Sequence, residues 1–174
     1  MGLDKGLGSR ETLLGWLSFV GLHSAFSLLV IPGIFFVFVW LSRLASSQKT
    51  VSLKTVFINL SYVLVPMGLA AWIAFSFGFL LPNGSYILHI LSDPFARGWD
   101  LIGTADFPWT PVATEWLVPL QFVTLFFGYI VSADYGLKLA HQTYADKSAA
   151  MKGFIPIFGF LTLVTIAFVW LYEG

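Results

Sequence analysis

His23 and Met67 are the side chains in this sequence that are best suited to hold a cofactor. Each lies in a long apolar stretch, His23 within GLHSAFS and Met67 within VPMG. At ~1.5 Å of rise per residue, His23 is expected roughly 15 Å below the outer end of a membrane helix. An ionisable side chain at that depth is costly unless it is paired. A His/Met pair is a known mode of haem ligation and needs no cysteine, so the two residues predict a haem b site with His23 as a metal ligand.

A structural interpretation of the same two residues stays open beside the haem site. A neutral histidine hydrogen-bonds readily to a neighbouring membrane helix, and methionine is a common filler of gaps in apolar cores. The small residues on both sides of His23 fit either interpretation, because they let a flat ring or another helix come close.

The segment 82–111 holds the next candidates, and it lies between two long apolar stretches. His89 is expected near the membrane surface, where a histidine suits the proton acceptor that quinol oxidation requires. Asp93 is expected to take part in the exit of those protons. The alternative for His89 is an interfacial side chain that packs the segment. Four further residues of the segment are predicted to dock a partner protein: Arg97, Trp99, Asp100 and Trp109.

Asp134 and Lys138 are spaced four residues apart, so they share one face of a helix. They are candidates for a proton relay. The competing interpretation is structural: the Lys138 side chain reaches for the membrane surface, with Asp134 as its ion-pair partner.

Composition places these residues in a membrane protein. Of the 174 residues 57% are hydrophobic and only 10% are charged, far below the charged share of soluble domains. The formal net charge is zero, which gives nucleic acid no basic surface to bind. The sequence contains no cysteine, so thiolate metal sites and ligation of iron-sulfur clusters by this chain are excluded. It also lacks nucleotide-binding and hydrolase motifs, which argues against an enzyme that acts alone.

Four apolar stretches, 13–41, 56–81, 112–139 and 154–172, are long enough to cross a hydrocarbon layer of ~30 Å. They must be helices, since lipid leaves no partner for an unpaired backbone amide. We therefore expect an all-α integral membrane protein, with residues 1–174 forming a single four-helix domain.

Orientation follows from the loop cations, which concentrate on the cytoplasmic side. These cations are Arg43, Lys49, Lys54, Lys138, Lys147 and Lys152. They outnumber Lys5 and Arg10 at the N-terminus, so both chain ends are expected outside. Segment 82–111 then becomes a periplasmic cap loop of a multi-pass protein of the bacterial inner membrane.

The cap loop is expected to be ordered and to contain a short helix on the membrane surface. Asn83-Gly84 is a turn signal and Ser85 can cap a helix. The stretch SYILHILSDPF has the apolar spacing of an amphipathic helix, which Asp93-Pro94 should end because a residue before proline avoids the helical region.

Residues 62–144, with the pattern LSDPF, GWDL, GTA and PWTP, resemble the C-terminal membrane portion of bacterial polyferredoxin-type proteins of the NapH/NosR kind. The resemblance implies membrane helices that work beside redox proteins and a loop exposed to the periplasm. This chain departs from those proteins in having no cysteine, so it carries none of their clusters.

Two functions are therefore expected. The first is a membrane-anchor subunit of a bacterial respiratory or related electron-transfer complex, with other membrane and periplasmic redox subunits as partners and a contribution to a quinone or haem b site. The alternative is a cofactor-free structural or assembly subunit of a photosynthetic or oxidase membrane complex.

Overall fold

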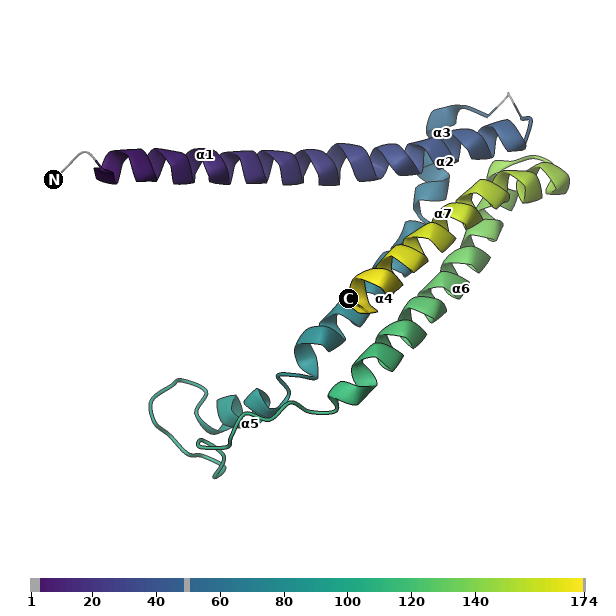
Figure 1. Ribbon diagram of the computed structural model, residues 1–174. Coiled ribbons are helices and arrows are strands. Elements are labelled where there is room, and N and C mark those ends of the chain that lie inside the picture. Colours follow the sequence, from purple (N-terminus) through teal and green to yellow (C-terminus); the bar gives the residue numbers. More distant parts are fainter. Residues whose placement is uncertain (1–3, 49–50, 174) are drawn as a thin grey trace.

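A computed structural model describes residues 4–48 and 51–173, with side chains described over 12–48 and 51–172; all elements assigned in these residues are helices (Figure 1). Lys49 and the side chains of Lys5 and Arg10, which entered the orientation argument, lie outside the described residues. The elements are α1 Asp4–Ala25, the π-helical η1 Phe26–Val30, α2 Ile31–Ala45, α3 Leu53–Ser61, α4 Leu64–Leu80, α5 Ser85–Ser92, the 3₁₀ turn η2 Thr114–Trp116, α6 Leu117–Thr143 and α7 Lys147–Glu173.

Four of the resulting helical segments are long and apolar enough to cross a membrane, as the sequence predicts. They cover Thr12–Ala45, Leu53–Leu80, Thr114–Thr143 and Lys147–Tyr172. Four of the eight ends lie three to seven residues beyond the apolar stretches, where capping and other polar or charged residues continue the helix; the other four differ by two residues or fewer. Ser52, for example, accepts the backbone N–H of Thr55 at 3.1 Å and thereby caps α3. The four segments indicate a multi-pass membrane protein.

Proline interrupts the first two membrane segments. Pro32 has no N–H to donate to the carbonyl four residues earlier. The π-helical turn η1 ends two residues before it, and the Ile31 N–H donates to the carbonyl of Phe26, five residues earlier. In the second segment α3 ends at Ser61, and α4 starts two residues before Pro66. Pro156, by contrast, lies inside the continuous helix α7.

The bundle consists of α4, α6 and α7, while α1 extends away from it (Figure 1). The continuation of the first segment, α2, returns to the bundle and packs against α7 and α3. Its buried side chains are Phe35, Val39 and Ser42, whereas every described side chain of α1 is exposed. The first membrane segment therefore joins the fold only through its second half.

Small residues let α4 and α6 approach closely. Gly128, Ser132 and Gly136 recur every four residues on the buried face of α6, the spacing that brings helix backbones together in membranes. A Cβ placed on Gly128 would overlap the Cβ of Ala70 on α4, and one on Gly136 would lie 2.9 Å from the ring of Phe154 on α7.

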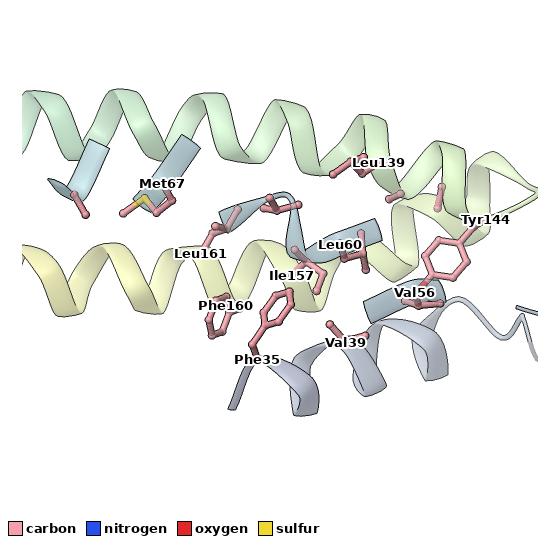
Figure 2. Close-up of a cluster of buried hydrophobic side chains, with 14 of the residues drawn as sticks. Phe35, Val39, Val56, Leu60, Met67, Leu139, Tyr144, Ile157, Phe160 and Leu161 are labelled. Carbon is pink, nitrogen blue, oxygen red and sulfur yellow. The ribbon is translucent and has the colours of Figure 1, made fainter. Parts of the chain in front are cut away.

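The buried apolar cluster joins α2, α3, α4, α6 and α7 (Figure 2). Tyr144 lies at one end of it, 3% exposed, and its hydroxyl hydrogen-bonds the Ser42 hydroxyl at 2.8 Å. The Tyr144 ring also covers Gly153, where a Cβ would lie 2.5 Å from a ring carbon. This contact fastens the short connection between α6 and α7 to the end of α2.

The connections α2–α3 and α6–α7 lie at one end of the molecule, and α5 with the rest of the cap loop lies at the other (Figure 1). The predicted short helix is present as α5, and it ends at Ser92 with Asp93 as its C-cap residue, as Asp93-Pro94 predicts. Its placement on a membrane surface and the N-out, C-out orientation stay predictions.

Candidate functional site

The cap loop is organised around Ser92, which is fully buried at the end of α5. Its hydroxyl donates to Asp100 Oδ1 at 2.6 Å and accepts the backbone N–H groups of Ile102 and Thr104 at 3.4 and 3.3 Å. The backbone carbonyl of Ser92 accepts the N–H of Leu101 at 3.1 Å. One serine thus gathers the backbone of residues 100–104 onto the end of the helix, and the loop is ordered by hydrogen bonds.

Asp93 and Asp100 serve as hydrogen-bond acceptors within the cap loop. The backbone N–H of Arg97 lowers the pKa of Asp93, helped by that of Gly98. The Ser92 hydroxyl lowers the pKa of Asp100, helped by the N–H of Ala105. Both carboxylates therefore favour the folded loop above the pKa of an unfolded aspartate, and this contribution is lost as the pH falls through their lowered values.

Arg97, Phe95 and Trp99 form an exposed cluster on the cap loop. The Arg97 guanidinium carbon lies 5.8 Å from the centre of the Phe95 ring and 5.6 Å from that of Trp99, which are cation-π distances. The two rings meet edge to face, with centroids 5.8 Å apart. Arginine and aromatic side chains are the types that most often carry binding energy at protein interfaces, so this arrangement keeps Arg97 and Trp99 as candidates for partner docking.

His89 and Trp109 share a hollow beside α5. Ser85, Tyr86 and Phe107 also line it, and its volume is about 190 Å³. The Ser85 hydroxyl accepts the N–H of Thr110 at 3.1 Å, which holds the Trp109 segment against α5. The hollow brings His89 and Trp109 together; Asp93, which accepts the N–H groups of Arg97 and Gly98, does not line it.

His23 lies exposed in the last turn of α1, eleven residues after the start of the membrane segment Thr12–Ala45. Its ring stacks on that of Phe19, one turn earlier, at a centroid distance of 6.0 Å and an interplanar angle of 14°. Both residues line a shallow apolar hollow made by α1 and η1 alone. A partner for the imidazole therefore has to come from outside the bundle of this chain.

Met67 lies inside the bundle, only 2% exposed. The Thr165 hydroxyl of α7 points to its sulfur at 3.9 Å, and Leu161 packs nearby (Figure 2). The structure does not bring Met67 and His23 together: α1 extends away from the bundle that contains α4 (Figure 1), and the hollow at His23 is lined by α1 and η1 alone. The haem site expected from the sequence is not assembled by this chain alone, and Met67 fits the interpretation as a core side chain.

Asp134 and Lys138 form the expected ion pair on α6, with 2.6 Å between the Lys138 Nζ and Asp134 Oδ2. The two side chains are 63% and 65% exposed, so the pair faces outward. An exposed pair of this spacing stabilises a helix by about 0.3–0.5 kcal/mol. The geometry confirms the pairing; a proton relay through it stays a prediction.

One polar side chain in a groove was not singled out from the sequence. Gln121, 6% exposed, lies one turn into α6 and donates from Nε2 to the carbonyl of Ala74 at 3.1 Å, while its Oε1 has no partner among the described residues. It lines a groove of about 280 Å³ between the start of α6 and the end of α7. A polar glutamine in an apolar helix was the available signal for this site. The amino-acid sequence alone does not show that the Oε1 atom of Gln121 is left unpaired.

Metal ligands do not cluster in the described part of the chain. Over residues 12–48 and 51–172, whose side chains are described, no group of three or more His, Cys, Asp or Glu is placed to hold a metal ion. A haem iron needs fewer protein ligands, and His23 is the exposed intramembrane candidate.

Comparisons of the chain with models of protein families, with curated proteins and with solved structures find no match.

Proposed function

We propose that this chain is a membrane-anchor subunit that joins a larger complex through its first helix. One observation carries the proposal: an exposed histidine lies in the apolar part of a helix that leaves its own bundle. Facing lipid, the His23 imidazole would keep an unsatisfied polar group in hydrocarbon, which is costly. A second membrane protein that packs along α1 removes this cost by supplying a hydrogen-bond partner or by sharing a cofactor.

The surface of α1 suits such packing. On the side of His23, the hollow that this residue lines with Phe19 and Phe26 can take a side chain of a partner helix. On the opposite side, Ser18, Gly21 and Ala25 lie three and four residues apart on one face, so a second helix can approach closely there. A Cβ on Gly21 would meet nothing within 4 Å, which leaves this face available to a partner. The Ser18 hydroxyl is satisfied inside the helix by the carbonyl of Gly15 at 2.9 Å.

More specifically, the chain would anchor an electron-transfer complex in the bacterial inner membrane. In it, His23 would help to hold a haem b together with a residue of a partner chain, and the haem would supply the electron transfer. The cap loop, with Arg97 and Trp99 exposed, docks a periplasmic redox protein. The cofactor-free assembly subunit is the second candidate, and the burial of Met67 against Thr165 favours it, because this chain then offers only one ligand.

Replacing His23 with leucine tests the proposal in the complex purified from native membranes. We expect partner chains to associate about threefold to tenfold more weakly, the range of one interhelical hydrogen bond in a membrane. Co-purification and the haem absorption spectrum are measured on the same sample. Ser18→Ala is the matched control, since its hydroxyl is used within α1, and it should change neither readout.

The two readouts separate the two candidate functions. A lost haem spectrum with all subunits retained assigns His23 as a haem ligand. Weaker association without any haem in the wild type supports the cofactor-free assembly subunit. A variant equal to the wild type in both readouts contradicts a role for His23 in joining the complex.

A further inference from the structure

The groove at Gln121 is enclosed by the first turns of α6 and the last turns of α7. Its main walls are Val118, Gln121, Phe122 and Leu125 of α6, with Val169 and Tyr172 of α7. None of the described side chains that line it carries a charge. An ionic headgroup finds no counter-charge on these walls, so the groove suits a neutral occupant.

The unpaired atom in the groove wall is a hydrogen-bond acceptor. The carbonyl of Ala74 can only accept, so the amide group that faces it at 3.1 Å has to be the NH₂ end of Gln121. The other end is therefore Oε1, which is buried and has no partner among the described residues. A buried acceptor without a donor is costly. Oε1 is covered by protein atoms, so a ligand that brings an O–H removes that cost once the side chains of the groove wall shift to admit its hydroxyl.

A second acceptor lies on the opposite wall. The Tyr172 hydroxyl donates its proton to the carbonyl of Ala71 at 2.9 Å, so its oxygen keeps lone pairs that can only accept. Tyr172 and Phe122 also give the groove two aromatic walls. The groove thus combines acceptors with flat apolar surfaces.

We propose that this groove binds a neutral, membrane-soluble ring compound of the hydroquinone class, with a ring hydroxyl donating to Gln121 Oε1. A quinone has carbonyl oxygens in place of the hydroxyls and cannot donate, so the site prefers the reduced form. Gln121 lies four residues after the start of α6, about 6 Å along the axis. This places the ring of the compound close to the end of α6, and an apolar tail attached to the ring would extend into the lipid.

Binding of a hydroquinone in this groove does not depend on the proposed docking of a partner along α1, although both take place in the membrane. The groove lies on α6 and α7, whereas the docking surface lies on α1. A chain that binds hydroquinone but joins no partner, or the reverse, would separate the two.

The experiment uses the full chain in nanodiscs of phosphatidylcholine and a photoactivatable alkyl-hydroquinone as the probe. We expect labelling of the peptides that contain residues 117–125 and 169–172. Unlabelled decylhydroquinone should compete about tenfold better than its dimethyl ether or decylquinone, which matches one hydrogen bond to an otherwise unpaired buried acceptor.

Gln121→Leu should remove this preference, so that the three competitors act alike. Ser132→Ala is the matched control: its hydroxyl is also buried on α6 without a partner among the described residues, but it does not line the groove, and the preference should persist. Equal competition by the three compounds in the wild type overturns the proposal, and this comparison stays decisive if Gln121→Leu fails to fold. Labelling spread over other helices overturns it too, because it indicates partition into lipid only.

Discussion

Replacing Gly128 with alanine should lower the free energy of unfolding by about 3 kcal/mol, the upper end of the cost of overpacking a close-packed interior. The added Cβ would overlap the Cβ of Ala70 on α4, and the carbonyl of Pro66 lies 3.6 Å away. Neither atom belongs to a flexible side chain, so the clash is relieved only when α4 and α6 move apart. The change is measured by titration with sodium dodecyl sulfate, followed by circular dichroism.

Gly68→Ala is the control for the glycine substitution itself. Gly68 lies in α4, and a Cβ there would meet nothing within 4 Å, so this variant should be as stable as the wild type or slightly more stable. Combining Gly128→Ala with Ala70→Gly moves the methyl group to the other helix, and we expect the double variant to recover most of the lost stability. A Gly128→Ala protein as stable as Gly68→Ala would contradict the close packing of α4 on α6.

Replacing Ser92 with alanine should open the cap loop. The variant leaves Asp100 without its hydroxyl donor and the N–H groups of Ile102 and Thr104 without their acceptor. Loss of hydrogen bonds around a buried group costs about 1–3 kcal/mol, so cleavage by trypsin at Arg97, the only Lys or Arg between Lys54 and Lys138, should become about tenfold faster or more. The rate is measured from the two fragments on a gel.

Ser76→Ala is the matched control for the cap loop. Its hydroxyl donates to the carbonyl of Trp72 within α4, and the rate at Arg97 should stay that of the wild type. Equal rates for Ser92→Ala and Ser76→Ala would show that Ser92 does not order the loop. In sealed vesicles, cleavage at Arg97 from the outside also tests the predicted periplasmic position.

The sequence predicted the helices well because the physical requirement is local. A membrane span needs ~20 apolar residues in succession, and that condition can be read without knowing any neighbour. The end of α5 was predictable for the same reason, since proline at position 94 restricts the residue directly before it. The exposed pair of Asp134 and Lys138 likewise follows from a spacing of four residues.

The packing of the helices was not predictable in the same way. In a membrane, side chains that face lipid and side chains that face another helix are equally apolar, so hydrophobicity does not mark the interface. Residue type and the apolar stretches paired His23 with Met67, but they could not show that α1 extends away from the bundle. The recurrence of Gly128, Ser132 and Gly136 was a usable signal for the contact between α4 and α6.

The roles of Ser92 and Gln121 depend on partners that are distant in sequence. Ser92 binds backbone groups up to twelve residues away, and Gln121 reaches a carbonyl on another helix, 47 residues earlier. Each is one polar residue among many when only residue type and spacing are known. The folded chain is needed to show that one gathers a loop and the other keeps a free acceptor.

The docking of a partner along α1 is tested most directly by photocrosslinking in native membranes. A photoreactive phenylalanine analogue at position 19 would lie beside His23, and the same analogue at position 127 on α6 is the control, since Phe19 and Phe127 are each 67% exposed. We predict that position 19 crosslinks to a second polypeptide and that position 127 crosslinks mainly to lipid. Crosslinks from position 19 to lipid alone, or to α4, α6 or α7 of the same chain, would contradict the proposal that the first helix joins this protein to a larger complex.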